Sequence, residues 1–194
     1  MAHGSGNNSI GGHPHAKVTS YLFISLDGVV EVPDTFVRSD LYEDFDPLTA
    51  EMIAEQDAVL LGRKTYDDWS VFWPQSTIEP FATFINTTPK YVVSKTLQSV
   101  DWHQSNLIAG NLGDEIAALK RQPGKTIGVH GSISLVQSLL TAGLLDELRF
   151  TLVPAVAGHG RRLLSRDGEP IQLTLDSTRV TPRGLQCMIF RPLA

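Results

Sequence analysis

A glycine, two adjacent cations and a threonine stand directly after a buried strand pattern. Residues 58–61 are continuous and apolar (AVLL), and Gly62-Arg63-Lys64-Thr65 follows without a gap. Two positive charges at the start of a helix oppose the helix dipole, which favours anions at that end. Glycine lets a ligand approach the backbone, the helix start offers free N–H groups, and Thr65 adds a hydroxyl donor. The segment therefore predicts an anion site.

Two further segments carry related chemistry. In VHGSISL, residues 129–135, Gly131 and Ser132 again open a predicted helix directly after a strand. Two helix starts that face each other would hold the two phosphates of a pyrophosphate. In YVVSKT, residues 91–96, Ser94 and Lys95 follow a strand and precede a second hydroxyl. These groups can bind a phosphate monoester, which on a dinucleotide is the adenosine 2′-phosphate, so the segment favours NADPH over NADH.

Each segment also has a plainer interpretation. Glycine after a strand is common in turns, Ser132 can be a simple N-cap, and the cations can be solvated surface charges. Neither glycine segment has the G-x-G-x-x-G spacing of the dinucleotide fingerprint or the Walker pattern. The spacing alone leaves both interpretations open.

The elements that must position these segments alternate between strand and helix. Strand patterns occupy residues 17–26, 58–61, 90–93, 106–109, 126–129, 147–153, 171–175 and 185–190. Helical patterns occupy 64–69, 78–85, 112–119 and the stretch from Ser132 to Ala142-Gly143, and a further helix is predicted to start after Asp46-Pro47, with Asp46 as its N-cap. The alternation predicts an α/β fold with a mostly parallel, twisted sheet covered on both faces and an antiparallel C-terminal edge. Ligands of such sheets gather beyond the carboxyl ends of the strands, where all three segments lie.

Length and composition favour one domain over residues 17–194, preceded by a disordered arm of residues 1–16. The chain has 194 residues and a net charge of -5, which argues against a general nucleic-acid binder. It has no apolar run of membrane-spanning length and no secretion-signal pattern at its start. Its single cysteine, Cys187, cannot form an internal disulfide, so we expect a reducing, cytoplasmic compartment. No metal site is expected, and one cysteine excludes the zinc motif of the nucleobase deaminases.

Several segments, read in order, resemble the dihydrofolate reductase-like superfamily. They are SLDGVV, LLGRKTY, YVVSK, VHGSISLVQSLLTAGLLDELRF and VPAVAGHGRRLL. They are most similar to stand-alone proteins related to the reductase domain of bacterial riboflavin biosynthesis, over roughly residues 17–191. The resemblance implies hydride transfer from NADPH to a small heterocyclic substrate of pterin or pyrimidine type. It also implies a homodimer, with the C-terminal strands and the AGHGRRLL segment as candidate contacts.

The resemblance assigns roles by position. The pyrophosphate would be contacted by Gly62, Arg63, Lys64, Thr65, Gly131, Ser132 and Ile133, and the 2′-phosphate by Ser94 and Lys95. Leu26 and Asp27 would lie beside the nicotinamide, at the mouth of the substrate pocket. The carboxylate that folate reductases carry on the helix before the Gly-Arg strand corresponds to Asp46. Asp27 and Asp46 are thus the candidate catalytic acids.

Three residues keep alternative roles. Asp46 is equally suited as a helix cap, and Asp27 as the residue that shapes the Asp-Gly turn. His130 replaces the first glycine of the pair found in folate reductases. It is either a bulky strand-end residue or a group near a phosphate that makes binding pH-dependent. A rival function follows from the acids: a non-catalytic NADP(H)-binding or scaffold protein of the same fold.

Overall fold

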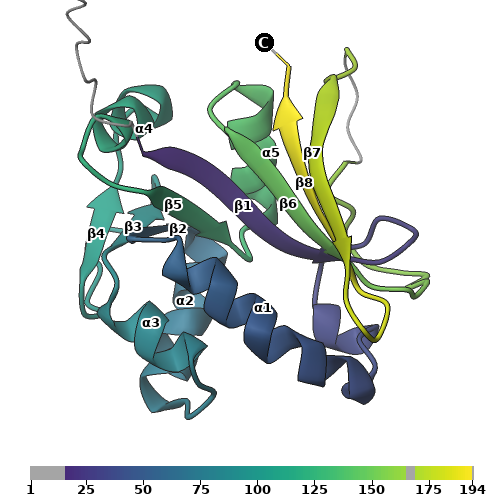
Figure 1. The fold of residues 1–194 in the computed structure, drawn as a ribbon. Coiled ribbons are helices and arrows are strands. Elements are labelled where there is room, and N and C mark those ends of the chain that lie inside the picture. The colour runs from purple at the N-terminus through teal and green to yellow at the C-terminus, as the bar shows by residue number, and fades with distance from the viewer. Residues whose placement is uncertain (1–15, 165–168, 194) are drawn as a thin grey trace, which may run out of the picture.

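A single mixed sheet organises the computed structural model, which describes residues 16–164 and 169–193. The strand order is β4-β3-β2-β5-β1-β6-β8-β7 (Figure 1). The strands are β1 (Lys17–Ile24), β2 (Ala58–Gly62), β3 (Lys90–Val93), β4 (Ser105–Ile108), β5 (Thr126–His130), β6 (Glu147–Leu152), β7 (Leu173–Val180) and β8 (Gln186–Pro192). Strands β1 to β6 are parallel, whereas β8 runs antiparallel to both β6 and β7. The predicted fold class is confirmed.

Helices cover both faces of the sheet. They are α1 (Tyr42–Ala54), α2 (Arg63–Phe72), α3 (Phe81–Thr87), α4 (Leu112–Lys120) and α5 (Ile133–Thr141), with short 3-10 turns at Pro33–Thr35, Ser39–Leu41 and Trp73–Gln75. In Figure 1, α4 and α5 lie above the sheet and α1, α2 and α3 below it. Alternate residues of β2 point to opposite faces of the sheet and join different apolar clusters. Leu60 packs with α5 on one face, whereas Val59 and Leu61 pack with α2 and α3 on the other.

The central strand β5 is buried at every residue, as a strand covered on both faces must be. Its Gly128 is required by a neighbour, since a Cβ atom there would lie 1.7 Å from Oε1 of Gln56. The Gln56 side chain, just after α1, therefore rests directly on the backbone of β5.

Helix α1 begins earlier than the sequence predicts, and the proposed cap at Asp46 is wrong. The helix starts at Tyr42, so Asp46 and Pro47 lie inside it. Pro47 costs the helix one backbone hydrogen bond. The first turn is held by tertiary contacts: Leu41 is fully buried, and the Asp44 carboxylate accepts the N–H of Arg183 at 2.9 Å. These contacts outweigh the local signal for a later start.

Ion pairs also connect α1 to the β6–β8–β7 side of the sheet. Glu51 accepts from Arg179 at 2.6 Å, and Glu55 accepts from Arg149 at 2.7 Å. Both carboxylates are more than half exposed, at 58% and 52%. Exposed pairs of this kind contribute little to stability, so α1 is held on this side mainly by the packing of Phe45 and Leu48 against Phe23, Val153 and Leu185, and the two solvated pairs add little.

Two smaller differences from the sequence concern the strands near the chain ends. Strand β1 ends at Ile24, and β7 runs from Leu173 to Val180, later and longer than predicted. Ala16 is buried and donates its N–H to Lys120 O, while residues 1–15 of the predicted arm lie outside the described part.

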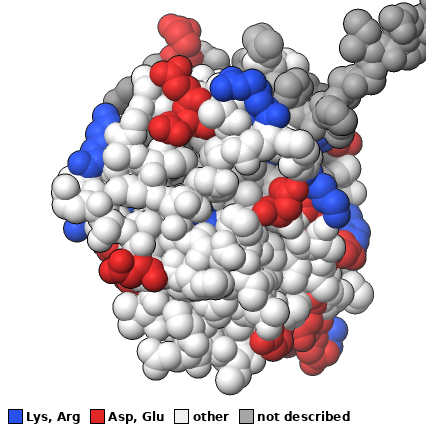
Figure 2. Space-filling model, turned by 90° about the vertical axis from the view of Figure 1, so that its left-hand side faces the viewer, with Lys and Arg blue, Asp and Glu red and all other residues white. Residues whose placement is uncertain are grey.

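The face in Figure 2 carries scattered charges of both signs with uncharged surface between them, and no continuous cluster of Lys and Arg. Across residues 16–164 and 169–193, the longest apolar helices fall short of what is needed to cross a bilayer.

Candidate cofactor and substrate site

The starts of α2 and α5 meet at one hydroxyl group. Helix α2 leaves the carboxyl end of β2, and α5 leaves the carboxyl end of the neighbouring strand β5. The Ser132 Oγ accepts the N–H of Gly62 at 2.8 Å and lies 2.9 Å from both Thr65 Oγ1 and His130 O. The two glycine-opened helix starts predicted to converge are thus hydrogen-bonded to each other.

Neither of these helix starts is capped by a side chain. Gly62, the N-cap of α2, has none, and the Ser132 hydroxyl is used in the bridge instead of capping α5. The first N–H groups of a helix have no acceptor within the helix. Two such sets of N–H groups, each at the positive end of a helix dipole, form a place where an anion is stabilised.

The close approach of the two helices depends on both glycines. Gly131 has φ +58°, and a Cβ there would lie 3.3 Å from Thr65 Cγ2. A Cβ on Gly62 would lie 3.3 Å from Ser132 Cβ. Thr65 is itself buried, and its hydroxyl faces Ser132. Thr65 therefore links the helices, whereas Lys64 beside it is exposed.

The third predicted segment lies within reach of the first. Ser94 is buried, and its Oγ accepts the N–H groups of Thr96 and Leu97, so it shapes the turn after β3. The Arg63 guanidinium donates to Thr96 Oγ1 at 2.9 Å and lies 3.4 Å from Asp67. Sequence reasoning placed Arg63 at the pyrophosphate only. The structure directs its side chain to the segment predicted for the 2′-phosphate, where the exposed Lys95 also lies.

Asp27 is held in a dense set of hydrogen bonds after β1. Its carboxylate accepts from Ser25 Oγ at 2.6 Å and from the N–H groups of Ala157 and Gly158, both at 2.9 Å. Arg162 also lies 3.3 Å from it. The hydrogen bond from Ser25, followed by that from Ala157, holds the pKa of Asp27 far below its usual range. This geometry favours the turn-shaping role over that of a proton donor.

Leu26, in the same turn, donates its N–H to Ala155 O while its side chain is 69% exposed. An apolar group left in water at the carboxyl end of β1 is free to contact a ligand there.

Two acidic residues of α1 differ in their surroundings. Asp46 is exposed, whereas Asp44 is buried and bonded to the β7–β8 turn. A hydrogen bond from Thr181, assisted by Arg183, lowers the pKa of Asp44. The spacing of Leu41, Asp44, Phe45 and Leu48 on one helical face could have revealed its burial.

His130 is a bulky, neutral strand-end residue. Burial lowers its pKa to about 3, so it does not titrate near neutrality, and the alternative of a pH-sensitive phosphate contact is not supported. Its Nε2 lies 2.8 Å from Gln56 Oε1. Gln56 donates its Nε2 to Met52 O, so His130 Nε2 carries the proton in this pair. The ring also stacks on Tyr21, with centroids 5.3 Å apart.

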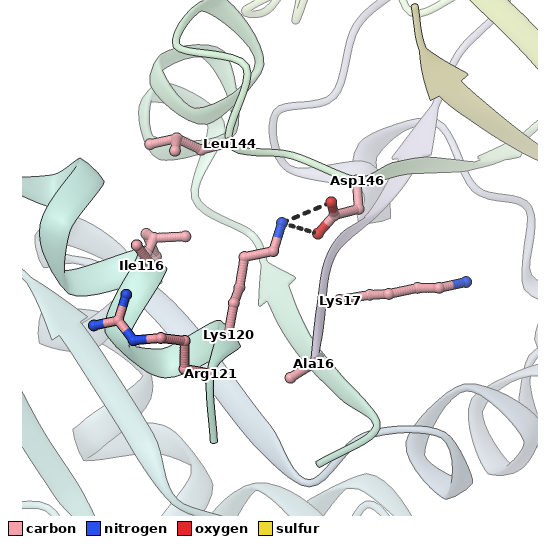
Figure 3. Close-up of a pocket in the computed structure, with 8 residues that line it drawn as sticks. Ala16, Lys17, Ile116, Lys120, Arg121, Leu144 and Asp146 are labelled. Carbon is pink, nitrogen blue, oxygen red and sulfur yellow. Dashed lines mark hydrogen bonds and ion pairs between the residues drawn. The ribbon is translucent and has the colours of Figure 1, made fainter. Parts of the chain in front are cut away.

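A hollow of about 550 Å³ opens at the opposite, amino end of β1 (Figure 3). It is lined in part by Lys17, Ile116 and Lys120, and Lys120 lies 2.7 Å from the Asp146 carboxylate. None of the residues that line this hollow belongs to the predicted cofactor segments, so the hollow is separate from the candidate cofactor site.

Comparisons with known proteins agree with this arrangement. The profile of the RibD C-terminal domain matches residues 16–187. YyaP of Bacillus subtilis, itself uncharacterised, is 30% identical over 173 residues, which are 87% of this chain and 91% of YyaP. A protein of Shewanella sp. PV-4, assigned provisionally to riboflavin biosynthesis, has a TM-score of 0.72 at 19% identity, over 92% of this chain and 99% of its own. A dihydrofolate reductase from Enterococcus faecalis, complexed with NADP(H), has a TM-score of 0.60 at 11% identity, over 92% and 97%. These two structures establish the fold.

Proposed function

Because this chain belongs to the RibD C-terminal domain family, we propose that it is an NADPH-dependent reductase acting on a small heterocyclic substrate of pterin or pyrimidine type. The observation that carries the proposal is the Ser132 bridge, which joins two uncapped helix starts at the carboxyl ends of β2 and β5. The proposed reaction is of the same type as that of the riboflavin-biosynthesis reductase, which acts on a 5-amino-6-(5-phosphoribosylamino)uracil.

The residues around the bridge fit a dinucleotide diphosphate. The N–H groups at Arg63 and Lys64 in α2, and at Ile133 in α5, belong to the first turns and lack intrahelical acceptors. Gly62 and Gly131 keep the surface clear of Cβ atoms that would crowd the bridge. Lys64 adds a positive charge, so the site combines oriented dipoles with a full charge.

A preference for NADPH is supported by the turn after β3. Arg63 reaches Thr96 at 2.9 Å, and Lys95 is exposed beside it. A guanidinium and an ammonium next to two hydroxyl groups suit a phosphate monoester, and the 2′-phosphate is what distinguishes NADPH from NADH.

When bound, the nicotinamide supplies a hydride. The part of this chain is to fix the ring beside the acceptor and to exclude water. We infer that Leu26 covers the ring, and its 69% exposure just after β1 supports this role. The acceptor also needs a proton. The Asp27 carboxylate is ionised and fully hydrogen-bonded, so we infer that the proton comes from elsewhere, with the exposed Asp46 and solvent as the candidates.

The test is titration with NADPH and NADH, followed by a panel of pterins and pyrimidines monitored by loss of nicotinamide absorbance. Lys95→Ala should weaken NADPH binding roughly tenfold or more and NADH binding little, because a hydrogen bond to a charged group contributes about 1.5–3 kcal/mol. Lys125→Ala, a change of the same charge at the amino end of β5, is the matched control. A wild-type protein that binds neither dinucleotide would refute the proposal, and equal losses in Lys95→Ala would remove Lys95 from it.

A second candidate is a non-catalytic NADP(H)-binding protein. The engagement of the Asp27 carboxylate by Ser25, Ala157 and Gly158 favours it, because that carboxylate is not available to hold a proton. Tight NADPH binding without oxidation by any compound of the panel would support this candidate over the reductase.

A further inference from the structure

We propose that Arg161 is a further binding residue for the diphosphate of the dinucleotide, acting at the start of α5. The inference rests on the proposed function and adds to it a cation from a distant part of the chain.

The backbone of Arg161 is fixed against the loop after β1. Its carbonyl accepts the N–H of Val30 at 3.0 Å, and its own N–H donates to Glu31 Oε2 at 3.1 Å. Gly160 before it has φ +111°, and a Cβ there would lie 2.7 Å from Val29 Cγ1. The backbone of residues 160–161 therefore packs closely against residues 29–31, and these contacts fix the position of the Arg161 backbone.

The Arg161 side chain lies on the first turn of α5. Its Nη2 donates to Ser134 Oγ at 3.0 Å, and Ser134 is the second residue of α5, two positions after Ser132. In residues 16–164 and 169–193 no carboxylate lies within ion-pair distance of this guanidinium; Glu31 meets only the backbone N–H. An unpaired cation at the positive end of a helix is unfavourable, and the arrangement becomes favourable when an anion is bound there.

The neighbouring arginine shows the contrast. Arg162 donates to the Asp27 carbonyl at 2.7 Å and lies 3.3 Å from the Asp27 carboxylate, so its charge is used within the fold. Of two adjacent arginines, one stabilises the turn after β1 and the other faces an uncapped helix start. Arg161 thus brings a cation to the start of α5 from the segment after β6, whereas the Arg63 guanidinium is directed to Thr96.

The test is calorimetric binding of NADPH, NADH and adenosine 2′-monophosphate, which lacks the diphosphate. Arg161→Ala should weaken both dinucleotides by about tenfold and leave the monophosphate unchanged. Arg161→Gln removes the charge but can still donate to Ser134, and should show the same pattern even if the alanine variant folds poorly. Arg121→Ala, an exposed arginine just after α4, is the matched control.

Each outcome decides a separate point. Wild-type affinity for both dinucleotides in the glutamine variant would overturn the role of Arg161 and leave the proposed function intact. Equal weakening of the monophosphate would also overturn it, because the effect would then not lie at the diphosphate. A wild-type protein that binds no dinucleotide would overturn the proposed function and this inference together.

Discussion

Replacing Ser132 with alanine should weaken both the fold and the cofactor site, because one hydroxyl holds the two helix starts together. The change removes the acceptor of the Gly62 N–H and the partner of the buried Thr65 hydroxyl. A lost hydrogen bond costs about 0.5–1.5 kcal/mol, and a buried group left without a partner about 1–3 kcal/mol. Thr65 can turn to recover one contact, so we expect a loss of roughly 2 kcal/mol in the free energy of unfolding.

Such a loss corresponds to a decrease in Tm of about 4–8 °C for a domain of this size. It should be measured by urea and thermal unfolding without cofactor. Ser138→Ala is the matched control, since Ser138 lies in the same helix, is exposed, and its hydroxyl donates to the backbone carbonyl of Ser134. NADPH binding should weaken in Ser132→Ala and not in Ser138→Ala. Equal stabilities of the two variants, within about 0.5 kcal/mol, would show that the bridge adds nothing to the fold.

Two further predictions concern pH. Burial lowers the pKa of His130 in the folded protein to about 3, whereas the pKa of this histidine in the unfolded chain is about 6.5. Between these two values the unfolded chain takes up a proton at His130 and the folded protein does not. Stability should therefore fall as the pH drops from about 6.5 toward 3, and urea unfolding of His130→Gln should show a shallower fall; parallel curves would contradict this. Asp27→Asn should be less stable than the wild type above pH ~4, and the difference should shrink as the pH falls further, because the carboxyl then takes up a proton in the unfolded chain while the folded carboxylate still accepts from Ala157 and Gly158. The pH profile of its NADPH oxidation should match that of the wild type; loss of a fall in activity at high pH, which a general acid produces when it deprotonates, would restore Asp27 as proton donor.

The sequence predicted the fold because its strongest patterns report burial. Continuous apolar runs correspond to β2 and β5, which are covered on both faces, and the absence of a helix between the last two strands gave the antiparallel edge. The glycines at positions 62 and 131 were also informative, because each marks a place where a Cβ would crowd the opposite helix. These signals are local and need no knowledge of distant contacts.

The remaining features depend on pairs far apart in the sequence. Asp44 meets Arg183 across 139 residues, and this contact fixed the start of α1 at Tyr42 against the local signal of Asp46-Pro47. Besides the nearby Ser25, Asp27 finds the N–H groups of Ala157 and Gly158, 130 and 131 residues away, which no spacing near the Asp-Gly turn could reveal. The homodimer, the cytoplasmic location and the catalytic roles stay predictions.

The solvated ion pairs at the end of α1 have a practical consequence. The helix bears Asp46 and lies over the face where substrate is expected, yet its links to Arg149 and Arg179 are the contacts that dissolved electrolyte screens most readily. Raising the ionic strength should therefore loosen the last turns of α1 first, while Phe45 and Leu48 keep its first turns packed in the apolar core, so affinities for substrate are comparable only when they are measured at one ionic strength.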